Sequence, residues 1–421
     1  MNRRYDFDWL RIFGAVMVVV AHCALSFSPW TAIFSPDGAF AELSNAPSSK
    51  FFSELLWNLN LWLMPLFMLL AGASVCYTLG KRSNRQYVRE RLLHLGFPLI
   101  VLLVIFIIPA TYWVRSSSGQ FDGSLLEFYL HYFEGVAPDG NFALFHMWFL
   151  VYLLIYALLA LPLFQFFASA AGRRLMDKLA RASKRTGGIY LFAIPLVIVQ
   201  LALIHVSPPP VFAALVNDGT RFVSFFLVFI FGYILNSDSR FQMAIARQWR
   251  LIAIVTVVTS AVMFVIAWQD SFNPYVSLPL DYSWEYVGFW TVFALSSWSW
   301  LITWLGVGQR FLNVNHSLLK RASTVTYPLY LLHPIVWIPS LFIVLPWQVN
   351  PFFGFVAQTV IVLIGTLALT ALLQCWSVTR FLLGLKTKTA PSQFSLRRSK
   401  GEENLPQGVS ATAEKGAILV Q

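Results

Sequence analysis

The sequence predicts an all-α integral membrane protein with about ten transmembrane helices and with both termini in the cytoplasm. Hydrophobic residues make up 57% of the 421 residues and charged residues only 12%, whereas a soluble globular protein carries about 25% charged residues. Because so few charges cannot cover the surface, lipid has to cover much of it. Apolar segments of spanning length alternate with basic segments, which is typical of a polytopic helical protein.

A helix needs about 20 predominantly apolar residues to cross the hydrocarbon core of a bilayer. The sixth candidate segment is short, but Arg221 and Asn236 at its two ends can extend it by reaching toward the membrane surface. An even number of spans places the two termini on the same side. Ten segments qualify, at residues 9–27, 55–79, 95–114, 147–167, 189–206, 222–235, 251–268, 286–307, 324–345 and 355–376.

The positions of the basic residues indicate which side that is. With a cytoplasmic N-terminus, 26 of the 30 Lys and Arg residues fall in cytoplasmic segments, as the positive-inside rule requires. Arg11 lies just inside the first span, and only Lys50, Arg115 and Arg221 fall outside. One missed span would invert this pattern downstream of it, so the charges support ten spans independently of hydropathy.

Almost the whole chain belongs to one membrane domain, residues 1–376. The remaining residues, 377–421, form a polar cytoplasmic tail that we expect to be mostly disordered. The two longest outer loops, residues 28–54 and 115–146, are long enough to cover or shape a site facing outward. No internal repeat is evident, which argues against a transporter built from inverted repeats.

Several classes of chemistry lack the residues that they need. The three cysteines, Cys23, Cys76 and Cys375, lie in apolar segments without partners at metal-ligand spacing, and no histidine–carboxylate cluster suggests a metal. The sequence has no phosphate-binding glycine-rich loop, no nucleophile elbow and no zinc-protease motif. We therefore expect no bound metal and no bound cofactor. The basic segments lack interleaved aromatic residues, so we also expect no nucleic-acid partner.

Two ionisable residues lie within the first span, Arg11 near its cytoplasmic end and His22 eleven residues later. An ionisable group inside a bilayer costs a few kcal/mol, so each one needs a reason. At about 1.5 Å per residue the two lie roughly 16 Å apart along the helix, nearly three turns, and so share one face. They can form a polar track in which Arg11 holds an anion and His22 handles a proton. Alternatively, Arg11 reaches the lipid headgroups and His22 only hydrogen-bonds a neighbouring helix.

Further polar residues lie at a similar depth in the ninth span. His333 stands ten residues into it, between Pro328 and Pro334, and Tyr327 and Tyr330 precede it at three-residue spacings. Proline frees backbone carbonyls and kinks a helix, often where helices line a cavity. The segment therefore predicts a cavity lined by hydroxyl and imidazole groups.

The second, third and fourth spans add further candidates. Arg91 lies at the cytoplasmic end of the third span, in a basic cluster that either binds phosphate or only sets topology. His146 and Trp148 open the fourth span in HMWFL, as binding residues or as members of the aromatic belt at a membrane surface. In the second span, the residues from Gly72 to Ser74 are small enough to let another helix approach closely.

Taken together, these segments resemble membrane-bound acyltransferase family three. The hallmark of that family is an Arg, ten residues and a His in the first span, and Arg11 and His22 match it. FDWLR, MPLFMLLAGAS, RERLLHLGFP, HMWFL and YPLYLLHP also resemble family segments in the same order, from about residue 5 to residue 376. The chain looks closest to the branch containing glucan biosynthesis protein C, the succinyltransferase of periplasmic glucans. Many members carry a second Arg three residues after the position of Arg91, where this chain has His94.

The resemblance implies an O-acyltransferase in a bacterial inner membrane. It would move an acetyl or succinyl group from cytoplasmic acyl-CoA, a substrate rather than a bound cofactor, to a hydroxyl of an extracytoplasmic glycan. Arg11 would then meet the phosphates or carboxylate of the donor, and His22 would be the general base or a covalent acyl carrier. Binding of acyl-CoA or acceptor would fall to Arg91, His146, Trp148, Tyr327, Tyr330 and His333.

Other functions are compatible with the same residues. A secondary transporter or flippase for a small anion or a lipid-linked sugar would also use an intramembrane Arg and His. A non-catalytic membrane scaffold would tolerate substitution of both. Among acyltransferases, the acceptor could instead be a lipid or an antibiotic-like small molecule.

Overall fold

The protein is mainly helical in the part of the chain that the computed structural model describes, residues 4–29, 47–117, 119–137, 140–204, 218–268 and 282–384. The only strand-like pairing in those residues is an isolated bridge between Val136 and Phe142. Eight of the described helices are long and apolar enough to cross a membrane. The prediction of an all-α integral membrane protein is therefore confirmed.

The eight candidate spans lie along the whole described chain, from Tyr5 to Leu373. One of them is a continuous helix built from α4 (Asn84–Arg91), α5 (Phe97–Leu102) and α6 (Ile108–Ser117), joined by the π-helical turns η2 (Leu92–Gly96) and η3 (Leu103–Ile107). The other seven are α1 (Tyr5–Ser26), α3 (Lys50–Leu79), α12 (Gly219–Ser237), α13 (Ser239–Ala267), α15 (Trp284–Val307) with its last turn η6 (Gly308–Leu312), α16 (Ser317–Val344) with η7 (Leu345–Trp347), and α17 (Pro351–Leu373).

Two further predicted spans take other forms. The fourth consists of η4 (Phe145–Met147) with α8 (Trp148–Leu159) and of α9 (Leu161–Ala168), and it bends by 42° between Leu159 and Leu161. The fifth, predicted over residues 189–206, is a shorter apolar helix made of η5 (Gly188–Phe192) and α11 (Ala193–Leu203). The described residues therefore hold eight spans, or nine with the bent pair, and the count of ten stays a prediction.

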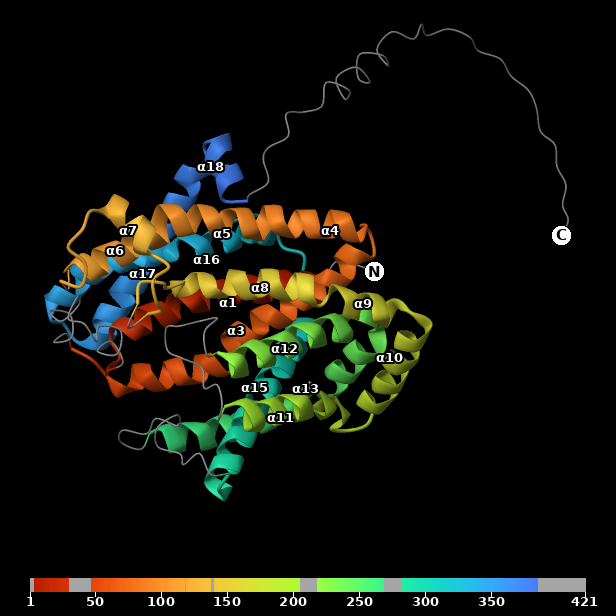
Figure 1. The fold of residues 1–421 in the computed structure, drawn as a ribbon. Coiled ribbons are helices and arrows are strands. Elements are labelled where there is room, and N and C mark those ends of the chain that lie inside the picture. The colour runs from red at the N-terminus through yellow and green to blue at the C-terminus, as the bar shows by residue number, and fades with distance from the viewer. Residues whose placement is uncertain are drawn as a thin grey trace, which may run out of the picture.

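Helices α1 and α3 form the centre of the bundle (Figure 1). Helix α1 packs on α3, α16 and α17, while α3 also packs on α12 and α15. The remaining helices form pairs at the periphery, such as α13 with α15 and α16 with α17. The helix that carries Arg11 and His22 is thus surrounded by protein rather than by lipid.

The closest helix contact joins α3 to α12. A Cβ atom on Gly72 would lie 1.8 Å from the carbonyl oxygen of Phe229, and one on Gly232 would lie 2.0 Å from the carbonyl oxygen of Leu69. Each glycine therefore receives the backbone of the other helix, an approach that only a missing side chain permits. The prediction that the small residues beginning at Gly72 admit another helix is confirmed.

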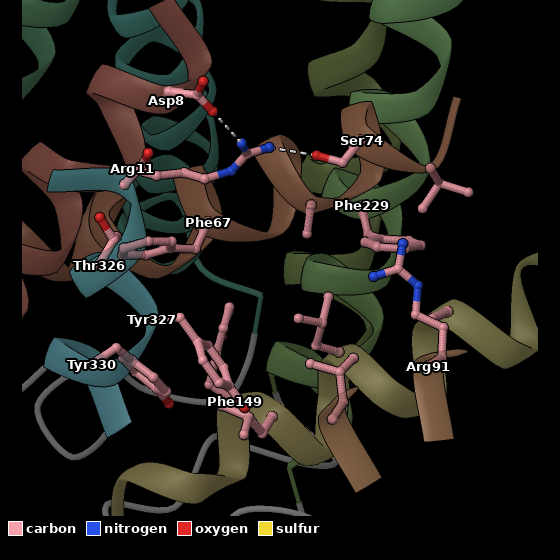
Figure 2. Close-up of a pocket in the computed structure, with 17 residues that line it drawn as sticks. Asp8, Arg11, Phe67, Ser74, Arg91, Phe149, Phe229, Thr326, Tyr327 and Tyr330 are labelled. Carbon is pink, nitrogen blue, oxygen red and sulfur yellow. Dashed lines mark hydrogen bonds and ion pairs between the residues drawn. The ribbon is translucent and has the colours of Figure 1, made fainter. Parts of the chain in front are cut away.

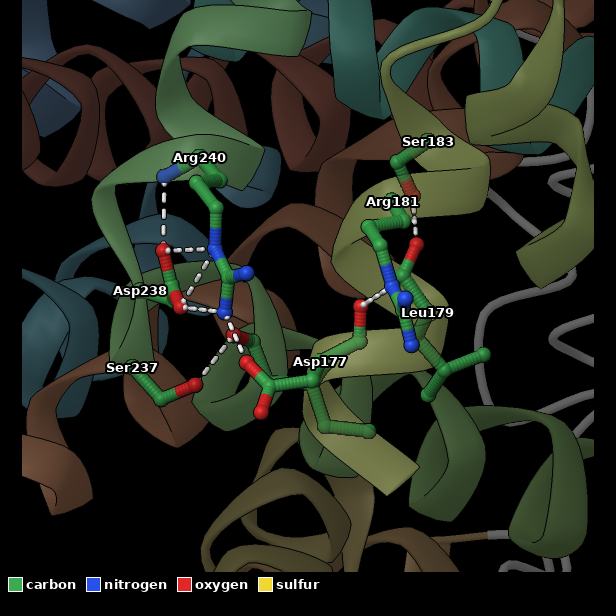
Figure 3. A network of polar contacts seen from close by, with 8 residues as sticks. Asp177, Leu179, Arg181, Ser183, Ser237, Asp238 and Arg240 are labelled. Atoms are coloured by element: carbon green, nitrogen blue, oxygen red, sulfur yellow. Dashed lines mark hydrogen bonds and ion pairs between the residues drawn. The ribbon is translucent and has the colours of Figure 1, made fainter. Parts of the chain in front are cut away.

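The described residues of the loops predicted to be cytoplasmic gather with the start of α1 at one end of the bundle, named here the basic end (Figure 1). The Tyr5 amide of α1 donates a hydrogen bond to Asn313 Oδ1 at 3.2 Å, beside the start of α16. Helix α10 (Ala170–Ser183) lies across this end (Figure 1). Arg240 binds both Asp177 of α10 and Asp238, and so joins α10 to α13 (Figure 3). Hydrogen bonds from Arg240 hold the pKa of Asp238 below its usual value.

The opposite end carries a small folded loop within the predicted outer loop of residues 115–146. Helix α7 (Leu125–His131) is followed by the buried Tyr132, whose hydroxyl donates to the carbonyl oxygen of Ala143 at 2.6 Å. Burial raises the pKa of Tyr132 to about 12, which keeps this donor protonated. The loop leads directly into η4 and His146 and so shapes that end of the bundle. Of the other long loop, residues 30–46 lie outside the described residues.

The predicted tail begins with a short helix rather than with an irregular segment. Helix α18 (Ser377–Leu382) packs Phe381 on Phe97 of α5, with 5.0 Å between the ring centroids. Residues 385–421, for which disorder is predicted, lie outside the described residues.

Replacing Gly72 by Val is expected to destabilise the protein by about 1–3 kcal/mol or more, because the new side chain would occupy the place of the Phe229 carbonyl. Thermal unfolding of detergent-solubilised protein, followed by size-exclusion chromatography, measures the loss. Gly288→Ala in α15 is the matched control, since nothing lies within 4 Å of its Cβ position. Equal midpoints for Gly72→Val and wild type would contradict the close contact of α3 with α12.

Candidate functional site

Three histidines from separate parts of the chain meet in the half of the bundle away from the basic end. The ring centroids of His22 on α1 and His333 on α16 lie 4.7 Å apart, and those of His333 and His146 lie 5.6 Å apart. Trp337, one turn after His333, lies 5.3 Å from His22. We name His22, His146 and His333 the histidine cluster. Within the described residues, no three His, Cys, Asp or Glu side chains are grouped so as to hold a metal ion.

Each ring in the histidine cluster is oriented by a backbone carbonyl. Nδ1 of His22 lies 2.8 Å from the oxygen of Val18, Nδ1 of His333 lies 2.7 Å from that of Tyr330, and Nε2 of His146 lies 3.3 Å from that of Leu331. A carbonyl oxygen can only accept, so these nitrogens carry the proton of the neutral ring. The other nitrogen of each ring then keeps its lone pair and can accept a proton.

Two of these lone pairs are buried without a partner. His146 and His333 are buried, and Nδ1 of His146 and Nε2 of His333 make no hydrogen bond within the described residues. A buried polar atom without a partner costs roughly 1–3 kcal/mol. Each such atom calls for an explanation, and in a histidine cluster a bound substrate or water molecule would supply one. His22 is only partly buried, so it is the member of the cluster that a substrate can reach most easily.

The backbone is strained directly before His146. Phe145 has a φ of 43°, in the left-handed region that residues with a Cβ atom rarely adopt. Such a conformation costs about 1–3 kcal/mol and persists only where surrounding contacts enforce it. Here the enforcing contacts are the burial of His146 and the hydrogen bond from the Tyr330 hydroxyl to its carbonyl oxygen, 2.5 Å long.

Arg11 is held between α1 and α3. Its guanidinium donates to Asp8 at 3.2 Å, to the carbonyl oxygen of Leu70 at 3.1 Å and to the hydroxyl of Ser74 (Figure 2). Ser74 in turn donates to the same Leu70 oxygen at 2.7 Å. With three protein partners, Arg11 faces the bundle interior, which argues against the alternative that it reaches the lipid headgroups.

A cavity of about 350 Å³ begins at Arg11 and extends between α1, α3, α8 and α16 (Figure 2). Arg91, at the end of α4, lines it as a second cation. The remaining walls combine hydroxyl groups near the basic end with aromatic and aliphatic groups deeper in the bundle. The polar lining is Asp8, Arg11, Ser74, Arg91, Ser323 and Thr326, and the aromatic lining is Phe67, Phe149, Phe229, Tyr327 and Tyr330.

An aromatic wall, formed by Phe67, Phe149 and Tyr330, separates this cavity from the histidine cluster. Phe149 lies 5.8 Å from Phe67 and 5.4 Å from Tyr330, measured between ring centroids. The tip of the Phe67 ring, from α3, contacts Gly14 of α1. A Cβ atom on Gly14 would lie 2.8 Å from Cζ of Phe67. The continuous polar track expected from Arg11 to His22 is therefore interrupted, because Phe67 of α3 fills the groove that Gly14 leaves.

Tyr330 contacts both the cavity and the histidine cluster. It lines the cavity, donates its hydroxyl proton to the His146 carbonyl, and lies 6.2 Å from His333 between ring centroids. Tyr327, one turn earlier, lines the cavity and donates to the carbonyl oxygen of His94 at 3.3 Å. The structure thus brings both predicted tyrosines into the site.

Position 94 lies outside the site. The ring of His94 is exposed, and its Nδ1 lies 3.2 Å from the carbonyl oxygen of Gly384, after α18. Arg91 faces the other way, into the cavity, and its guanidinium lies 4.9 Å from the centroid of the Tyr87 ring. Position 94 therefore contributes no side chain to the cavity.

Trp148 also lies apart from the histidine cluster. Its ring packs on Tyr152 at 5.4 Å and on Phe225 of α12 at 6.0 Å, and Arg221 lies 5.7 Å from it. These contacts make it part of the packing between α8 and α12. The structure therefore separates Trp148 from the other residues that the sequence predicts for the site.

Several residues of the site were not predicted as site residues by the sequence analysis, among them Asp8, Phe67, Ser74, Phe149 and Trp337. Two of them have a sequence signal, because Asp8 lies three residues before Arg11 and Trp337 lies four residues after His333, spacings that share one helix face. Ser74 was noted only as a small packing residue. Phe67 and Phe149 have no signal of their own among 38 phenylalanines.

Comparison with protein families gives a match over nearly the whole chain. The family model described as an acyltransferase domain matches residues 4–375. The match covers every candidate span and every residue of the site. Searches of curated proteins and of solved structures find no significant match. The chain therefore belongs to acyltransferase family three and is a multi-pass membrane acyltransferase.

Proposed function

We propose that the protein transfers a short acyl group, acetyl or succinyl, from acyl-CoA to a hydroxyl of an extracytoplasmic glycan in a bacterial inner membrane. The observation that carries the proposal is the adjacency of two features. A cavity with two arginines opens toward the basic end. Behind its aromatic wall lie three imidazoles, each with one ring nitrogen that can accept a proton.

The donor would enter from the basic end, which the positive-inside rule assigns to the cytoplasm. Arg11 and Arg91 offer charge-assisted hydrogen bonds to phosphate, or to the carboxylate of a succinyl group. The cavity of about 350 Å³ is at the small end of the range for ligand pockets, about 300–1,000 Å³. It suits the pantetheine arm, with the nucleotide remaining outside.

His22 would act as the general base. Its Nε2 takes the proton of the acceptor hydroxyl while the hydroxyl oxygen attacks the thioester carbonyl carbon. The new C–O bond forms, the C–S bond breaks, and the departing sulfur receives the proton back from the imidazolium. A positioned base contributes about 10²–10⁴-fold to such a rate. A covalent route, in which the same nitrogen first carries the acyl group, needs no further residue.

Tyr330 would serve the donor side of the same reaction. Its hydroxyl group can donate a hydrogen bond and lies between the cavity and the histidine cluster, so it can stabilise the oxyanion formed on the thioester. His333 and His146 would accept hydrogen bonds from further acceptor hydroxyls through their unpartnered nitrogens. Transfer requires Tyr330 to leave the His146 carbonyl, because its side chain stands between the thioester and His22.

Substitution of His22 by Gln is expected to lower ester formation about 10²–10⁴-fold without loss of the protein from the membrane. Mass spectrometry of ester-linked acyl groups on envelope glycans measures this in a strain lacking the gene, complemented with wild type, with His22→Gln or with His94→Gln. The His94 variant is the control, since that ring is exposed and outside the cavity. Equal ester in all strains would refute glycan acylation and favour a transport function.

Arg91→Gln is expected to raise the KM for acyl-CoA by about 10–100-fold with a smaller change in kcat, because a charge-assisted contact is worth about 1.5–3 kcal/mol. Initial rates of reconstituted enzyme at varied acyl-CoA give both constants. Arg89→Gln, two residues earlier and exposed outside the cavity, should leave KM unchanged. A KM shift shared by both variants would mean that the basic end attracts the donor only through its net charge.

Phe149→Ala is expected to let the enzyme use longer acyl chains, because this ring closes the cavity at the aromatic wall. Each methylene accommodated in an apolar pocket is worth about 1–3 kcal/mol, so the rate ratio of hexanoyl-CoA to acetyl-CoA should rise at least about tenfold. Phe225→Ala in α12, outside the cavity, is the control. An unchanged ratio for Phe149→Ala would show that the aromatic wall does not limit acyl length.

A further inference from the structure

A second cavity, of about 560 Å³, lies on the periphery of the bundle next to the basic end. It runs along α11 and is closed on one side by Leu295 of α15. The side chains that line it are mainly aliphatic. Three of these residues are exposed, with exposed fractions of 42% for Leu191, 52% for Ile194 and 59% for Ile198. In a protein surrounded by bilayer, such a groove faces lipid chains rather than water.

One end of this groove is polar and positively charged. Arg185 lines it, together with the turn of Gly187 and Gly188. Gly187 has a φ of 75°, and nothing lies within 4 Å of its Cβ position, so the space beside the turn is open. Arg185 is exposed and has no ion pair within the described residues.

The neighbouring charges of α10 are engaged differently. Arg181 donates to the Asp177 backbone carbonyl at 3.3 Å, and the Asp177 carboxylate binds Arg240 of α13 (Figure 3). Arg173 donates to the carbonyl oxygen of Ala168. These contacts fix α10 across the basic end, and Arg185 is the one cation of this segment that lines the described groove.

The length of the apolar helix places that charge at the level of the headgroups. The five 3-10 residues of η5 and the eleven α-helical residues of α11 together span about 26 Å, which is less than the hydrocarbon thickness of about 30 Å. A short span draws the membrane surface toward its ends. Basic pockets at the ends of spanning helices are the sites where anionic headgroups bind.

We propose that this groove binds one anionic phospholipid, with its phosphate on Arg185 and an acyl chain along α11 between Leu191 and Ile198. The positive charge of Arg185 favours an anionic headgroup, and the aliphatic side chains that line the groove favour a molecule with an acyl chain. A free phosphate would gain only the contact with Arg185. The proposal concerns the lipid-facing surface of the bundle and does not depend on the acyl-transfer reaction.

Native mass spectrometry of the full chain released from phosphatidylglycerol nanodiscs tests the proposal. Wild type is expected to retain one lipid, and Arg185→Gln to bind it at least about tenfold more weakly. Arg174→Gln is the matched control, since this exposed residue of the same basic segment does not line the groove, and it should bind like wild type. Equal retention by Arg185→Gln and Arg174→Gln would overturn the proposal.

Two further arms identify the ligand chemistry. Ile194→Trp, which fills the groove without altering charge, should weaken retention as well, and unchanged retention would show that the chain lies elsewhere. Glycerol phosphate, added at the same concentration as the lipid, should not displace it. Displacement by glycerol phosphate would identify a site for a free phosphate and would overturn the assignment to phospholipid.

Discussion

The guanidinium of Arg11, which α1 and α3 hold between them, is the group on which the arrangement of the site depends. A cation inside a bilayer is tolerated only when protein atoms replace its water, and here Asp8, the Leu70 carbonyl and Ser74 do so. Because these partners lie on both α1 and α3, the same contacts set the rotation of α1 against α3. That rotation directs Arg11 into the cavity and carries His22, eleven residues later, toward α16.

Close contacts with further helices also fix the positions of α1 and α3. Gly72 and Gly232 let the backbones of α3 and α12 touch, so α3 cannot shift without moving α12. Gly14 admits Phe67, which then completes the aromatic wall. Small residues thus serve two purposes in this bundle: they bring helices together, and they decide where an aromatic ring can stand between the cavity and the histidine cluster.

The aromatic wall and the histidine cluster suggest how such an enzyme avoids wasteful hydrolysis. In the proposed mechanism, in which His22 is the general base, water that reached His22 from the basic end would be activated as readily as an acceptor hydroxyl. In the structure, Phe67, Phe149 and Tyr330 separate the two compartments. A wall that yields only when the donor displaces Tyr330 would couple access to His22 to the presence of the thioester.

Composition, hydropathy and charge placement were sufficient to predict an integral membrane bundle, because burial in lipid acts locally along the chain. Helix periodicity also predicted that Arg11 and His22 share one helix face, but not that an aromatic wall stands between them. The meeting of His22 with His333 and His146, the bond from Arg11 to Ser74 and the separate position of Trp148 were decided by tertiary structure alone. The reason is geometric. Contacts between helices depend on their relative rotation and depth, which close packing at residues such as Gly72 sets and which no single segment encodes.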